Sequence, residues 1–184
     1  MKLEARPGQA LSSHLQGVAD RAEKFGEKFH SEHYCRVAAL IHDYGKASPE
    51  WQRYLYEPQS RMSHAPESAG LALQLFGKLG LPLAYAIKGH HSHLPDWHGD
   101  LDRFMTLPQD ALIAALNPDS FLGDDKVLRQ GLMREIGRIG AVTTEYLPLW
   151  IRMIASALID ADRLDAEAFD SPDAGALRGR YESW

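Results

Sequence analysis

Apolar residues recur at spacings of three and four through most of this chain, and that periodicity limits what it can fold into. Between residues 11 and 29, Leu11, Leu15, Val18 and Ala22 lie on one helix face. Similar spacing predicts further helices over residues 32–44, 49–55, 64–79, 82–91, 107–116, 124–139 and 141–169. Alternation of the kind found in strands is weak. The pattern predicts an all-α fold, a compact globular helical bundle.

A few capping and helix-stop residues predict where the helices begin and end. Ser12 or Ser13 is expected to cap the first helix. Gly45 is a plausible stop for the second, which we expect to end at Tyr44. Ser48-Pro49 reads as the N-cap and first position of a short third helix.

Size and composition narrow the class of protein. A chain of 184 residues fits one domain, predicted over 1–184. The net charge of −5 offers no overall attraction for nucleic acid. Cys35 is the single cysteine, so no intrachain disulfide is expected, and a packed thiol is favoured. No apolar run reaches about 18 residues and the start lacks a signal peptide, so we expect a cytoplasmic protein that contacts no membrane.

The stretch AALIHDYGK ends an apolar helix with an imidazole beside a carboxylate. The helix dipole does not favour an acid such as Asp43 at a C-terminus, although a solvated helix end would tolerate one. His42 precedes Asp43, and Lys46 follows three residues later. Lys46 alone would be an ordinary solvated lysine.

Four further histidines are candidates for the same chemistry. His14 borders the apolar face of the first helix and, alone, would more readily be a hydrogen-bonded core residue. His64, near a helix start, could be a surface residue. His90 and His91 are harder to dismiss, because both are expected to continue an inward face, where adjacent imidazoles repel if charged and are costly if unpaired. A bound metal would resolve both problems, since neutral imidazole is a preferred ligand.

The stretch LIDADRLDAE supplies the last candidate. Asp162 continues the apolar face that ends at Leu158, whereas Asp160 lies about 200° away round the helix. We therefore favour Asp162, with a surface charge or a pair with a neighbouring arginine as the structural alternatives. Asp165 is assigned to the solvated face.

Together these residues are five imidazoles and two carboxylates. Seven ligands exceed the needs of one ion and suit two ions about 3.5–4 Å apart. Asp43 is the natural bridge, because each carboxylate oxygen can bind a different ion. Mixed nitrogen and oxygen ligands suit Fe, Mn, Co or Ni better than Mg.

The order H…HD…H…HH…D resembles the HD superfamily of metal-dependent phosphohydrolases. In detail it resembles the HD nuclease domain of the CRISPR-associated helicase-nuclease of type I interference. The matching stretches are LSSHLQGVA, AALIHDYGKASPEWQRYL, SHAPESAG, GHHSHLPD and LIDADRLDAE. The resemblance implies that the metal ligands are His14, His42, Asp43, His64, His90, His91 and Asp162. It also implies that Lys46 sits over the scissile phosphate.

The same resemblance implies nicking and exonucleolytic degradation of single-stranded DNA by water activated between two metal ions. A helicase domain or subunit would feed the strand, and a crRNA-guided surveillance complex would be a further partner. The helicase motif GxxxxGK[ST] is absent from these residues. The tail ALRGRYESW reads as the start of another helix, which favours a domain excised from a longer chain over a stand-alone subunit.

Basic and aromatic residues near the motifs suggest a path for the strand. The basic candidates are Lys46, Arg53, Arg61, Lys88 and Arg103. The aromatic candidates for base stacking are Trp51, Tyr54 and Trp97, although packing in the core or at its rim is favoured for them.

Two other functions share some of these features. An HD phosphohydrolase for a small nucleotide would keep the metal site but enclose it in a cavity that reads the base. A non-catalytic, metal-stabilised interaction module is disfavoured, because a complete ligand set and Lys46 are both present.

Overall fold

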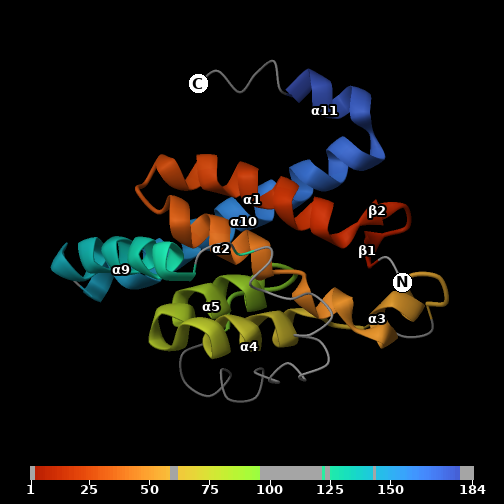
Figure 1. The fold of residues 1–184 in the computed structure, drawn as a ribbon. Helices are drawn as coiled ribbons and strands as arrows, with labels where there is room; N and C mark the ends of the chain where they lie inside the picture. The colour runs from red at the N-terminus through yellow and green to blue at the C-terminus, as the bar shows by residue number, and fades with distance from the viewer. Residues whose placement is uncertain (1–2, 59–61, 96–121, 123–124, 143, 179–184) are drawn as a thin grey trace.

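In the computed structural model, residues 3–58, 62–95, 122, 125–142 and 144–178 are described, and they form a bundle of helices (Figure 1). The all-α class is confirmed, with one small antiparallel pair of strands among these residues, β1 (Glu4–Arg6) and β2 (Gln9–Ala10). The helices are α1 (Leu11–Glu27), α2 (Glu32–Ile41), α3 (Pro49–Tyr54), α4 (Ala65–Phe76), α5 (Leu81–Gly89), α9 (Asp125–Val142), α10 (Leu147–Asp170) and α11 (Pro172–Arg178). Short 3₁₀ helices are η1 (Tyr44–Ala47), η2 (Gly77–Gly80) and η3 (Thr144–Tyr146). The helix expected over 107–116 lies outside the described residues.

Three helices make the centre of the bundle. α1 packs along α2, and α10 packs against α1, α2 and α5 (Figure 1). The predicted inner face of α1 is buried, from Leu11 to Ala22, and Leu158 of α10 is fully buried beside it in the core. Removing these apolar faces from water stabilises the fold by roughly 25 cal/mol per Å². This packing sets the middle of α10 against the first turns of α1.

The start of α1 differs from the prediction. The N-cap is Ala10, with no side-chain cap, rather than Ser12 or Ser13. The backbone N–H of Leu11 instead donates to the carbonyl oxygen of Leu3 at 2.9 Å. The strand pair therefore satisfies a helix-terminal donor that sequence patterns assign to a serine.

The expected end of α2 at Tyr44 is also wrong. α2 ends at Ile41, and η1 then turns the chain before α3 begins. Ser48 caps α3 as predicted, because its Oγ accepts the backbone N–H of Trp51 at 3.1 Å. His42 and Asp43 consequently lie in the junction between two helices rather than inside the last turn of one.

α4 and α5 form the most apolar part of the described chain. Residues Ala65–Gly89 are long and apolar enough to cross a membrane by length and composition alone, but 61% of the apolar 18-residue window within that stretch is buried inside the protein. η2 divides the stretch, and the two helices pack against each other and against α2. The hydropathy of this segment is therefore accounted for by the core.

α9 is joined to α2 by a buried carboxylate. Glu135 accepts the backbone N–H groups of His33 and Tyr34 at 2.9 and 3.0 Å, and its Oε1 lies 2.7 Å from Nδ1 of His33. Glu135 thus serves as a cap for α2 supplied by another helix. Although Glu32, His33 and Glu135 are close enough to hold an ion, the Glu135 oxygens already have these partners.

Candidate metal centre

Asp43 lies at the centre of a buried cluster of ionisable side chains. Its carboxylate is 1% exposed and stands where the end of α2, the start of α4, the end of α5 and α10 converge. All seven residues predicted from the sequence meet there, in two groups that share Asp43.

One group surrounds Oδ1 of Asp43. His64 Nε2 lies 2.7 Å from this oxygen and His90 Nε2 lies 3.6 Å from it. His91 Nε2 is 3.1 Å from His64 Nε2. Two imidazole nitrogens so close together can share one proton or face one cation.

The other group surrounds Oδ2 of Asp43. His14 Nε2 is 3.2 Å and His42 Nε2 is 3.5 Å from Oδ2. Oδ1 of Asp162 lies 3.3 Å from the same His14 nitrogen and 3.7 Å from the His42 nitrogen. Each oxygen of Asp43 therefore faces its own set of imidazoles.

Several polar atoms of the cluster are buried without a hydrogen-bond partner. They include Nε2 of His42 and Nε2 of His90. The Nδ1 atoms of His42 and His90 face backbone carbonyl oxygens, of Ala39 and Ile87, which leaves each Nε2 free to act as a ligand. Burying such atoms unpaired is costly, and a cation would remove the cost. The donor set and these atoms fit a divalent metal.

The pKa values of Asp43 and His14 also indicate a site that favours a bound cation. Burial alone would raise the pKa of the Asp43 carboxyl, but the charges of His42 and Lys46 and hydrogen bonds from His14 and His64 hold it well below its usual range. Burial alone would lower the pKa of His14, but hydrogen bonds to Asp162, Asp165 and Asp43 raise it to about 10. The carboxylates on this side thus create a strongly negative environment.

Near His91, the pKa values of the imidazoles are lowered rather than raised. Burial, together with His90 and His64, lowers the pKa of His91 to about 4. Burial also lowers the pKa of His64. Both imidazoles are therefore neutral near pH 7, which is the form that binds metal.

Lys46 is the one lysine in direct contact with Asp43 among the described residues. Its Nζ lies 2.6 Å from Oδ2 of Asp43 and 5.7 Å from the centre of the Trp51 ring. Lys46 is 8% exposed, so the alternative of a solvated lysine is excluded. Trp51 is itself buried and packs on His64, which fits the packing interpretation of this aromatic residue.

A family model described as HD domain matches residues 11–167, which include all seven clustered residues. The chain belongs to the HD-domain family. No curated protein matches the sequence. This HD domain is thus a metal-dependent phosphohydrolase in its general class, and the buried cluster fits the binding of divalent metal. That each of the seven residues is a ligand, and that 1–184 is a single domain, stay predictions.

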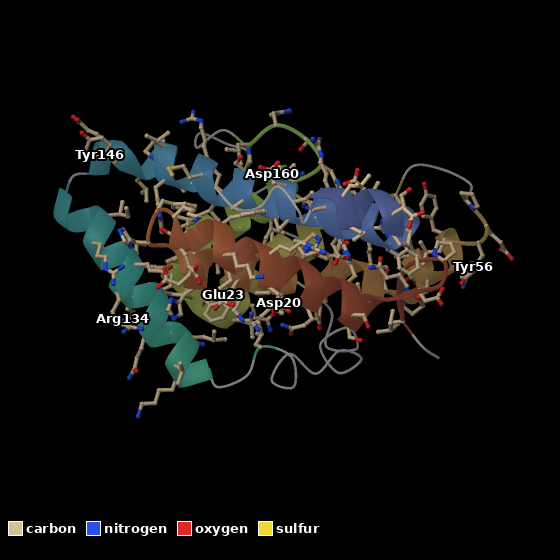
Figure 2. The ribbon with its side chains drawn as sticks, turned by 90° about the horizontal axis from the view of Figure 1, so that it is seen from above. Asp20, Glu23, Tyr56, Arg134, Tyr146 and Asp160 are labelled. Carbon is tan, nitrogen blue, oxygen red and sulfur yellow. The ribbon has the colours of Figure 1, made fainter. Side chains whose placement is uncertain are left out.

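Two expectations about individual residues of the HD domain are wrong. His91 is exposed rather than buried, because α5 ends at Gly89 and helical spacing no longer applies beyond it, but its Nε2 still turns to the cluster, 3.1 Å from His64 Nε2. Asp165 is buried rather than solvated, because α1 packs over it. Asp160 is exposed on α10 (Figure 2). Asp162, which the spacing favoured, lies in the cluster.

Besides Lys46, two of the basic residues predicted to bind substrate lie on described helices. Arg53 is exposed on α3, and Lys88 is half-buried near the end of α5. Their part in substrate binding stays a prediction. Arg61, Trp97 and Arg103 lie outside the described residues.

Gly45 brings η1 against the start of α4. A Cβ on this residue would lie 2.3 Å from the carbonyl oxygen of His64, while the Gly45 N–H donates to Ser68 Oγ at 3.0 Å. We expect Gly45→Ala to push His64 away from Asp43, to lower the free energy of unfolding by about 1–3 kcal/mol and to reduce metal content. Denaturant titration and elemental analysis would measure the two effects.

Gly137→Ala is the matched control, because a Cβ at this exposed position of α9 meets nothing within 4 Å. Alanine is a better helix residue than glycine, so this variant should gain about 0.5–1 kcal/mol and keep its metal. A Gly45→Ala protein with wild-type stability and metal content would show that the close approach is unnecessary.

Proposed function

We propose that this HD domain is a nuclease that cleaves single-stranded DNA, by nicking and by exonucleolytic degradation, with two divalent ions at the cluster. The observation that carries the proposal is the division of the cluster around Asp43. Oδ1 faces His64 and His90, and Oδ2 faces His14 and His42, so one carboxylate can serve two ions. Fe, Mn, Co or Ni suits these ligands better than Mg.

Bound divalent ions would lower the pKa of coordinated water and polarise the phosphate oxygens. The chain's own residues supply the remaining requirements. His64 and His91, whose pKa values are lowered, present neutral imidazoles, and burial of Asp43 keeps competing water from its oxygens. Lys46 is a compact positive charge beside Asp43, suited to the negative charge that develops on a phosphate during hydrolysis.

Access to the cluster favours a substrate that approaches from the His91 side. His91 is exposed, whereas His14 and His42 are fully buried. Lys46 has 11% of its side chain exposed and Asp162 has 19%. A phosphodiester would therefore meet the group around Oδ1 of Asp43 first.

Single-stranded DNA as the substrate is supported by the HD-x-G-K and GHH motifs of the sequence. The same resemblance supports the proposed partners, which are a helicase domain or subunit and a crRNA-guided surveillance complex. The expected cytoplasmic location stays part of the proposal.

The proposal is tested with metal-free protein reloaded with Mn²⁺, Ni²⁺ or Fe²⁺ and given circular single-stranded DNA. We expect nicked and then shortened products, and no products from Asp43→Ala. Absence of nicking with every metal would exclude the nuclease. Faster hydrolysis of mononucleotides than of DNA would instead identify a phosphohydrolase of small nucleotides.

A further inference from the structure

Asp165 contacts the back of one ligand in the cluster. It follows Asp162 by three residues, so both lie on the same side of α10. Its Oδ2 lies 2.8 Å from His14 Nδ1 and accepts a hydrogen bond from Gln9 Nε2 at 3.0 Å. Both Asp165 and Gln9 are buried, at 8% and 7% exposure.

Gly17 makes room for this contact. A Cβ on Gly17 would lie 2.2 Å from Oδ1 of Asp165, so any larger residue would displace the carboxylate. Arg21, one turn further along α1, has its Nε 4.0 Å from the same oxygen. The carboxylate is thus held by β2, α1 and α10 together, on the side of His14 away from Asp43.

The contact determines how His14 presents its other nitrogen. With metal bound, a carboxylate at Nδ1 would keep the proton there and leave Nε2, which faces Asp43 and Asp162, free to bind the ion. His42 and His90 rely on backbone carbonyls for the same purpose. An anionic partner strengthens a ligand more than a neutral carbonyl does.

The two groups around Asp43 therefore differ in charge. The group with His14 and His42 includes Asp162 and has Asp165 behind it. The other group has three histidines and no carboxylate besides Asp43. An ion in the first group would meet the carboxylates of Asp43 and Asp162 and a better-oriented nitrogen, and these outweigh the single positive charge of Lys46, which lies 2.6 Å from Oδ2 of Asp43 on the same side.

We propose that Asp165, supported by Gln9, is a positioning residue that holds His14 and makes the His14–His42–Asp162 position the tighter of two metal positions. This inference rests on the two-ion centre of the proposed function, but it concerns metal binding and needs no nucleic acid. Asp165 itself contacts neither Asp43 nor the other histidines of the cluster in the hydrogen bonds and ion pairs of the described residues.

The test is calorimetric titration of metal-free protein with Mn²⁺, together with metal content after gel filtration. Wild type should bind in a tighter and a weaker step. Asp165→Asn should weaken the tighter step by about 10–100-fold and leave the weaker one unchanged. The matched control is Asp160→Asn, an exposed carboxylate on the same helix, which should bind as wild type does.

Gln9→Met is a second variant, of similar volume, in case Asp165→Asn does not fold. Losing one donor to Asp165 should weaken the same step by a smaller factor, a few-fold at most. If both variants bind Mn²⁺ as the wild type does, the proposal is overturned. Equal weakening of the two binding steps would also overturn it, because that result indicates a general structural role for Asp165. A single binding step in the wild type would overturn the two-ion centre, and Asp165 would then be judged by whether its replacement weakens that step.

Discussion

Asp43→Ala should release most of the bound metal and lower phosphodiester hydrolysis by more than about 100-fold. Replacing a residue that only hydrogen-bonds to a metal ligand already lowers metal affinity or activity by about 10–100-fold. Asp43 contacts both groups of ligands directly, so its loss should have a larger effect. Metal content should fall toward zero or one ion per chain. Elemental analysis and steady-state hydrolysis of a phosphodiester substrate would measure the two losses.

The same substitution should abolish the stabilisation that metal gives the fold. A ligand at one hundred times its Kd stabilises the native state by about 2.7 kcal/mol, and Asp43→Ala should lose that increment for each ion released. In the metal-free protein, removal of the carboxylate leaves Lys46 buried without its partner, at a cost of about 3–5 kcal/mol. Asp160→Asn is the control and should change neither quantity. Retention of two ions by Asp43→Ala would show that Asp43 does not bridge them.

Each local signal in the cluster was weak, and the resemblance to the HD superfamily brought the seven residues together as one predicted site. His42 and Asp43 end a buried helix, His90 follows an apolar face, and Asp162 continues another. Helical spacing places Asp162 correctly on α10, whereas His42, Asp43 and His90 lie just beyond the helices that were expected to contain them. Which oxygen of Asp43 meets which histidine depends on how α1, α5 and α10 cross, and no spacing within a single helix contains that information.

The prediction that Asp165 is solvated was wrong for a different reason. Its spacing of three from Asp162 already placed it on the inner side of α10, but a charged residue beyond the apolar face was assigned to solvent. Burial became favourable only because Gly17 opens space in α1 and His14 and Gln9 supply donors. Both His14 and Gln9 belong to distant parts of the sequence. The hydrogen bonds that offset the burial of the Asp165 carboxylate can therefore be seen only in the folded structure.

The missed strand pair and the early end of α2 have a common cause. β1 and β2 contain three and two residues, too few for an alternating pattern to be recognised. Likewise, Gly45 was interpreted as a helix stop, whereas its main requirement is the close approach of the His64 carbonyl. Contacts between segments, rather than local preference, decide the conformation at these positions.

Lys46→Met should lower turnover by about 10²–10³-fold while the metal content stays at the wild-type level. The lysine carries no lone pair for a metal when protonated, and its Nζ lies 2.6 Å from Oδ2 of Asp43 with 11% of the side chain exposed, so its charge can act on a phosphate bound at the cluster. Methionine keeps most of the volume against Trp51 but removes the charge. Single-turnover hydrolysis at saturating metal would measure the loss.

A purely structural role for Lys46 makes the opposite prediction. If the lysine serves only as the counter-ion of Asp43, Lys46→Met destabilises the metal-free protein by about 3–5 kcal/mol, and bound metal restores both stability and wild-type turnover. If it acts on the phosphate, metal restores stability but turnover stays low. Lys24→Met, an exposed lysine on α1, is the matched control for loss of one positive charge. Because metal loading separates the two roles, turnover of the loaded variant decides whether the lysine of the HD-x-G-K motif acts in catalysis.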